Sequence, residues 1–203
     1  MNYLQFQKQF SEFPAISIRE MEKLDSSFNP RNLTNWQTKG YIQKIRNGWY
    51  VLADRKASEG LLFTIANQIY TPSYVSLESA LSWHGLIPEG VFTTTSVCSR
   101  KTQSFETVLG KFSYQNLHPS VLTGFQLKES NGWRFKMADS EKALVDFFHL
   151  HVHYDSIDSI NGLRLNPLII KDLSWDKINF YANLFQNKAL FQRLQFLKDA
   201  IIN

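Results

Sequence analysis

Residues 29–52 read NPRNLTNWQTKGYIQKIRNGWYVL, and this stretch decides the fold of the first quarter of the chain. Its first half carries the start and stop signals of a helix. Asn29 is a favourable N-cap, and Pro30 suits the first helical position because its missing amide hydrogen would have no partner there. Gly40 suits the position just past a helix end, where the backbone turns left-handed. The stretch therefore predicts a helix between Pro30 and Gly40.

The second half of the stretch predicts a β-hairpin. Residues 41–46 alternate between apolar and polar side chains, as a half-buried strand does. Asn47-Gly48 is the strongest short hairpin turn, because both residues tolerate positive φ angles. Residues 49–52 are then expected to return as the second strand.

Two further helices are expected before this stretch. Residues 3–10 predict a short helix. Ser17, followed three residues later by Glu20, forms a capping box that opens a second helix, with Met21 and Leu24 facing the core. The order helix, turn, helix and hairpin is that of a winged helix-turn-helix. In that geometry the second helix enters the major groove of DNA and the hairpin contacts the adjacent backbone.

Polar and basic side chains gather on the hairpin and on the side of the predicted helix opposite Leu33 and Trp36. Their donors and acceptors suit base edges and phosphates. An ordinary solvated helix face has the same composition, so the helix alone leaves both interpretations open. The candidate DNA-contacting residues are Arg31, Thr34, Asn35, Thr38 and Lys39 on the helix, with Lys44, Arg46 and Asn47 on the hairpin.

The positive charge of the chain is concentrated near its start. The formal net charge is +4, and residues 1–56 hold nine Lys and Arg against five Asp and Glu, whereas residues 57–203 hold thirteen of each. A compact basic unit suggests a polyanionic partner, because Lys and Arg displace counterions from phosphates. A basic face that serves only solubility is the alternative. We expect two domains, a winged helix over 1–56 and an α+β domain over 57–203.

The remainder of the chain predicts a mixed body of helices and strands, so the expected fold class is α+β. Asp139 suits the N-cap of a helix whose buried side faces the core. The expected buried residues of that helix are Ala143, Leu144, Phe147 and Phe148. Helices are expected over 58–70, over 76–84, from 139 and over 175–201. Strands are expected over 91–97, 112–117, 121–127 and 133–137. Residues 155–166 are expected to form a polar connection.

The sequence offers little catalytic chemistry. His149, His151 and His153 precede Asp155, and these are metal-ligand types, but on a helix only the first and third histidines share a face. We therefore favour a structural role for them. Residues 54–56, Asp-Arg-Lys, form the one acidic-x-lysine pattern that a metal-dependent nuclease would need, and no strand surrounds it. We expect a binding protein that is not an enzyme and holds no metal or cofactor, with a metal-dependent enzyme acting on nucleic acid as the alternative.

The sequence argues against a membrane protein, a secreted protein and a disulfide-stabilised protein. No apolar run approaches the ~20 residues that a membrane helix needs. The first residues, MNYLQFQKQFSEF, lack the apolar block of a signal peptide. The single cysteine, Cys98, cannot form an internal disulfide. We expect a cytoplasmic protein with no membrane partner.

Three stretches resemble one protein family. Residues 74–89, YVSLESALSWHGLIPE, resemble the start of the C-terminal region of AbiEi-type antitoxins. Residues 139–146, DSEKALVD, resemble the later E-K-A-L-x-D segment of that family. Residues 31–52 are similar to its winged helix and wing. The resemblance spans about residues 15–150, and the tail after about Tyr154 carries no signature of the family.

The resemblance implies a transcriptional regulator of a type IV toxin–antitoxin system. Such a regulator binds the double-stranded DNA of its own promoter and represses an operon that also encodes a nucleotidyltransferase-like toxin. The family offers no catalytic residues, so Glu141, Lys142 and Asp146 are expected to be structural. Members also occur as orphan regulators, and a body that senses a small ligand is a further alternative.

Overall fold

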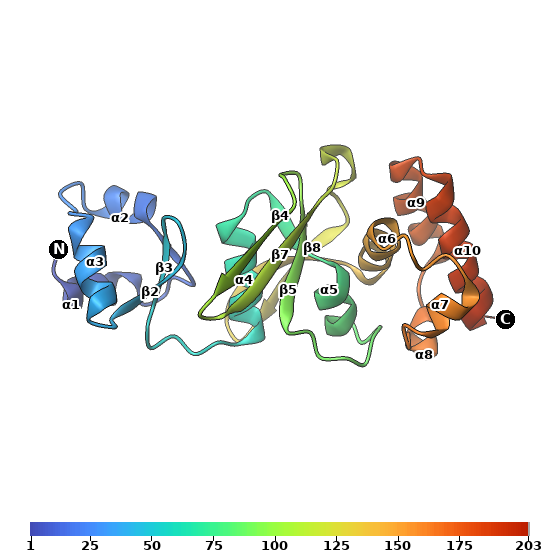
Figure 1. Cartoon of the computed structure of the whole chain (residues 1–203), viewed down its shortest axis with the longest axis horizontal. Helices are drawn as coiled ribbons and strands as arrows, with labels where there is room; N and C mark the ends of the chain where they lie inside the picture. The colour runs from blue at the N-terminus through green and yellow to red at the C-terminus, as the bar shows by residue number, and fades with distance from the viewer. Residues whose placement is uncertain (203) are drawn as a thin grey trace.

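The computed structural model describes residues 1–202 and has an α+β fold. Three parts follow one another along the long axis of the molecule: an N-terminal unit, a body built on a six-stranded sheet, and a group of C-terminal helices (Figure 1). The two ends of the chain lie at opposite ends of this axis. The N-terminal unit therefore turns one side to the body and its far side to solvent.

The N-terminal unit contains the expected helices and hairpin. Its elements are α1 (Tyr3–Phe10), β1 (Ile16–Ser17), α2 (Ile18–Leu24), α3 (Arg31–Thr38), β2 (Ile42–Arg46) and β3 (Trp49–Leu52), with the strands in the order β1-β3-β2. The predicted capping box is present, because Ser17 Oγ accepts from the Glu20 N–H at 3.1 Å and Glu20 Oε2 accepts from the Ser17 N–H at 2.7 Å. Helix α3 begins one residue later than predicted, because Pro30 takes the N-cap position, although Asn29 Oδ1 accepts from the Arg31 N–H at 3.0 Å. Gly40 follows the end of α3 with a φ of 68°, as predicted.

A separate apolar core holds the N-terminal unit together. Trp36 on α3 packs against Phe6 on α1, with ring centroids 4.7 Å apart, and Leu33 is buried on the same side of α3. Met21 is also buried, but Leu24 is 49% exposed, so the expectation that both would face the core was wrong for Leu24. Burial of Leu33 and Trp36 fixes the rotation of α3 about its axis and turns its other side to solvent.

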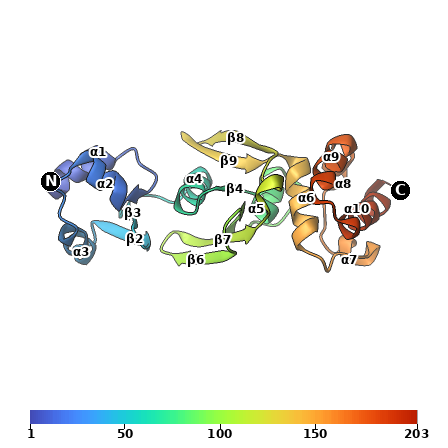
Figure 2. The same cartoon turned by 90° about the horizontal axis from the view of Figure 1, so that it is seen from above.

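The body is a mixed sheet with helices on both faces. Its strands are β4 (Ser73–Val75), β5 (Thr93–Cys98), β6 (Gln103–Thr107), β7 (Gly110–Asn116), β8 (Phe125–Ser130) and β9 (Trp133–Ala138), in the order β6-β7-β5-β4-β9-β8. The β5–β7 and β4–β9 pairs are parallel and the others are antiparallel. Helix α4 (Glu59–Ile69) lies on one face, and α5 (Leu77–Trp83) packs on β5 from the other (Figure 2).

Strand β7 alternates between the two faces. Phe112 and Tyr114 are fully buried, and the Tyr114 hydroxyl donates to the carbonyl oxygen of Ala66 on α4 at 2.8 Å. Because side chains alternate along a strand, Lys111, Ser113 and Gln115 lie on the opposite face. That face is the one that α5 covers in part.

The C-terminal helices differ from the sequence prediction at two places. They are α6 (Ser140–Leu150), α7 (Ile157–Asn161), α8 (Pro167–Lys171), α9 (Trp175–Phe185) and α10 (Lys188–Ile202). The expected polar connection over 155–166 is wrong, because it contains α7, which Ser156 caps and Ile160 anchors in the core. No local pattern predicts α8, β4 or the partly exposed edge strand β6. The strand expected over 121–127 is β8 (Phe125–Ser130), which begins later because residues 119–121 form a 3-10 helix. Asp139 caps α6 as predicted, accepting from the Lys142 N–H at 2.9 Å.

Candidate nucleic-acid interface

The predicted helix residues share one solvent-facing surface. Leu33 and Trp36 are buried on the inner side of α3. Helix α3 lies on the side of the N-terminal unit away from the body, with the β2–β3 hairpin between them (Figure 1, Figure 2). The surface, called here the outer face of α3, consists of the exposed residues Arg31, Thr34, Asn35 and Thr38, followed by Lys39.

The charge around this surface is positive. Residues 29–52 contain four Lys and Arg and no Asp or Glu. Two acidic groups of the unit have close partners, because Glu20 caps α2 and Asp25 lies 3.2 Å from the amino group of Met1, whereas Glu12 and Glu22 are exposed. The Ser27 hydroxyl and that amino group lower the pKa of Asp25. The outer face of α3 therefore has the sign of charge that attracts phosphate.

Arg46 does not belong to this exposed set, which corrects its placement as a hairpin contact. Its guanidinium donates to the carbonyl oxygen of Ile69 and lies over the ring of Phe105, 4.5 Å from the centroid. It therefore attaches the hairpin to the body and does not present its charge to solvent. The other two predicted hairpin residues, Lys44 and Asn47, are exposed.

The structure adds one basic residue that sequence reasoning missed. Arg19, exposed on α2, lines a small cavity together with Asn47, Gly48 and Trp49 at the hairpin turn. The two segments meet because the Ile18 N–H donates to the carbonyl oxygen of Gly48 at 3.0 Å. Because almost thirty residues separate α2 from the hairpin turn in the sequence, no local pattern predicts this contact.

The residues considered above as metal ligands contact different side chains and do not converge on one site. His149 packs on Phe185 with ring centroids 4.3 Å apart, and His151 Nε2 lies 3.2 Å from Glu78 Oε1. Asp54 is exposed and accepts from the amide of Gln7 at 3.5 Å. Over residues 1–202, no three His, Cys, Asp or Glu side chains gather in a way that could hold a metal ion.

A buried polar cluster, Tyr74, Ser76, Lys142 and Asp146, joins the two body stretches quoted above, 74–89 and 139–146. Lys142 and Asp146 form an ion pair with both side chains 0% exposed. Asp146 Oδ2 also accepts from the Tyr74 hydroxyl at 3.0 Å and from the Ser76 hydroxyl at 2.9 Å. Burial raises the pKa of the Asp146 carboxyl, and the Lys142 ammonium opposes that shift. The cluster holds α6 against β4 and the start of α5.

Comparison with known proteins leaves the family resemblance untested. A scan of the chain against models of known protein families finds no match. A search of curated protein sequences finds no significant match either. Within residues 1–202, none of the helices combines the length and the apolar character that a membrane span requires.

Proposed function

We propose that this protein is a transcriptional regulator that binds double-stranded DNA through its N-terminal unit, with α2, α3 and the β2–β3 hairpin acting as a winged helix-turn-helix. The observation that carries the proposal is the outer face of α3. It gathers hydrogen-bonding and cationic side chains on one exposed surface, backed by a buried apolar side. A helix of this kind is suited to the major groove, which is wide enough to admit it.

Two kinds of contact are expected from this face. Arg31 and Asn35, four residues apart on one side of α3, suit base edges, since Arg pairs with guanine and Asn with adenine in the major groove. Lys39 and Lys44 suit phosphates, which position the protein on the duplex but carry no sequence information. Arg46 has no place in this contact set, because the body holds its guanidinium.

The resemblance to AbiEi-type antitoxins supports a finer proposal. The protein represses its own promoter, and its body neutralises a nucleotidyltransferase-like toxin encoded in the same operon. Contact between the quoted body stretches through Asp146 supports the interpretation of Lys142 and Asp146 as structural residues. Growth rescue on co-expression with such a toxin tests this part of the proposal; toxicity that is unchanged by the protein contradicts it.

Titration of a labelled duplex from the protein's own upstream region tests the DNA-binding proposal. Asn35→Ala is expected to weaken binding by about 1–3 kcal/mol, and Lys39→Ala to weaken it on every sequence and lower the salt slope by about one. Lys171→Ala, which removes an exposed lysine at the far end of the molecule, is the matched control and should bind like the wild type. Equal affinity for the promoter and for an unrelated duplex, unaffected by Asn35→Ala, would overturn the proposal.

A further inference from the structure

A cavity of about 630 Å³ opens in the body, on the face of the sheet opposite α4. Its volume lies within the range of sites that hold small organic ligands. The walls come from the start of α5, the end of α6, and the loops around residues 87–92 and 154. The floor is the face of β5 and β7 that carries Thr93, Thr95, Lys111, Ser113 and Gln115.

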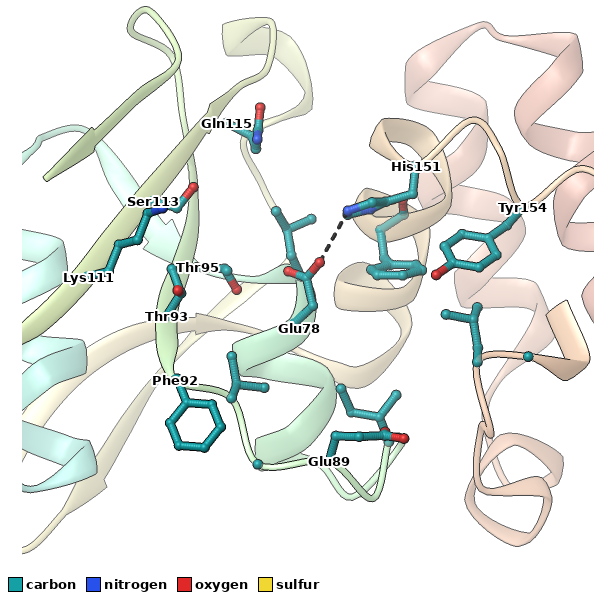
Figure 3. A pocket seen from close by; sticks show the side chains of 17 residues that line it. Glu78, Glu89, Phe92, Thr93, Thr95, Lys111, Ser113, Gln115, His151 and Tyr154 are labelled. Atoms are coloured by element: carbon teal, nitrogen blue, oxygen red, sulfur yellow. Dashed lines mark hydrogen bonds and ion pairs between the residues drawn. The ribbon is translucent and has the colours of Figure 1, made fainter. Parts of the chain in front are cut away.

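Three chemically different regions follow one another across this cavity (Figure 3). Lys111 lies at one side, with the hydroxyls of Thr93 and Ser113 on the same sheet face. Glu78 lies in the middle, and His151 and Tyr154 lie at the other side. The ligand that fits this order must carry an acceptor-rich anionic group, then hydrogen-bond donors, then a flat or apolar part.

The middle region is a charge pair that can still accept hydrogen bonds. His151 Nε2 lies 3.2 Å from Glu78 Oε1, and its Nδ1 lies 3.0 Å from the carbonyl oxygen of Phe147. Because both ring nitrogens face acceptors, the imidazole can donate to both when it is protonated and then balances the Glu78 charge. A carboxylate offers about four acceptor sites. Glu78 can therefore accept from a ligand while it stays paired with His151.

The third region is aromatic. Tyr154 stacks on Phe147 at a centroid distance of 5.5 Å and 29° between planes, and Phe147 stacks on His151 at 4.2 Å. Phe92, at the rim of the cavity, is 98% exposed. In Figure 3 this ring lies on the Thr93 and Lys111 side of the cavity, so the aromatic wall that a planar ligand can lie against consists of Tyr154, Phe147 and His151.

We propose that this cavity binds a nucleoside monophosphate. The order of cation, carboxylate and aromatic wall matches the order of phosphate, ribose and base. A carboxylate accepts from ribose hydroxyls, as the acidic residue of dinucleotide-binding folds does, and bases stack on aromatic side chains with little dependence on sequence. The floor strand is long enough, because the four steps between the five residues from Lys111 to Gln115 span about 13 Å in an extended strand. The proposal does not depend on whether the N-terminal unit binds DNA.

Calorimetric titration of the full chain with AMP, GMP, CMP and UMP tests this site. At least one monophosphate is expected to bind, and its nucleoside and inorganic phosphate should each bind about tenfold more weakly or worse, because each lacks part of the contact set. Lys111→Ala should weaken binding of the monophosphate about tenfold through the loss of a charge-assisted hydrogen bond. Lys188→Ala, which removes an exposed lysine of α10 outside the cavity lining, should bind like the wild type.

A second variant tests the aromatic region separately. Tyr154→Leu should weaken the monophosphate about tenfold and leave the affinity for inorganic phosphate unchanged, because it removes a stacking surface only. The ribonucleotide should also bind more tightly than its 2′-deoxy form. Absence of binding by all four monophosphates overturns the proposal. So does binding that Lys111→Ala leaves unchanged, or inorganic phosphate that binds as tightly as the nucleotide.

Discussion

The outer face of α3 and the buried polar cluster around Asp146 use similar residue types in opposite environments. On α3, Arg31 and its neighbours are exposed and the helix is held by Leu33 and Trp36 beneath them. On α6, Lys142 and Asp146 are fully buried and satisfy each other. Polar residues on the exposed side of an amphipathic helix can bind a partner, whereas polar residues inside a core bind each other and stabilise the fold.

The hairpin shows the same contrast within one strand. Lys44 is exposed, whereas Arg46, two residues later, binds the carbonyl oxygen of Ile69. The β2–β3 register shifts between these two residues, and Ile45 between them joins the core of the body. A basic residue on a predicted hairpin is therefore available for the proposed DNA contact only where the rest of the molecule leaves it exposed.

Breaking the buried pair should have the largest effect. Asp146→Ala leaves the Lys142 charge buried without its partner, so we expect the free energy of unfolding to fall by about 3–5 kcal/mol in urea denaturation. The double variant Lys142→Met with Asp146→Leu should recover most of this loss, because two apolar side chains leave no uncompensated charge. A loss below about 1 kcal/mol for Asp146→Ala would contradict the structural role of the cluster.

Two arginine variants, one on the outer face of α3 and one on the hairpin, test the same contrast in the N-terminal unit. Arg31→Ala should weaken promoter binding by about 1–3 kcal/mol and change stability by less than about 0.5 kcal/mol. Arg46→Ala should lower the free energy of unfolding by about 1–3 kcal/mol, because a charged hydrogen bond is lost, and should affect DNA affinity less than Arg31→Ala does. Duplex titration and urea denaturation of both variants check this. A larger loss of DNA affinity in Arg46→Ala than in Arg31→Ala, with the stability of Arg46→Ala unchanged, would contradict these roles.

The smallest expected effect concerns pH and the Glu78–His151 pair. Burial lowers the pKa of His151, but the hydrogen bond and charge of Glu78 outweigh it and raise the pKa above 6.5. The pair therefore stabilises the fold fully only between about pH 4.5, the unfolded value of Glu78, whose pKa the pair lowers, and about pH 6.5, the unfolded value of His151. This contribution is lost as the pH rises through the higher pKa of folded His151. Because both side chains are partly exposed, the contribution is at most about 1 kcal/mol.

Glu78→Gln isolates this contribution. The stability difference between the wild type and Glu78→Gln should shrink as the pH rises above about 6.5, because folded His151 has a raised pKa and loses its charge as the pH passes through it. Glu89→Gln, at an exposed carboxylate of the 87–92 loop, is the matched control and should show no such trend. A wild-type advantage that stays constant over this pH range would contradict the ion pair.

Local signals explain why much of the N-terminal unit could be predicted from the sequence. The Ser17–Glu20 capping box, Gly40 at the helix end and Asn47-Gly48 at the turn each act within a few residues. The interaction of Arg46 with Phe105 joins residues about sixty positions apart, so no local pattern reveals it. The same holds for the cavity, where Glu78, Lys111 and Tyr154 meet only after the sheet and helices have packed.

The most direct test of the central claim is to locate the DNA contact by amide chemical-shift mapping of the full chain with its promoter duplex. We expect the largest shift changes on residues 31–39 and at Lys44, with residues 57–202 little affected. Shift changes concentrated in the body, with the outer face of α3 unaffected, would contradict that claim.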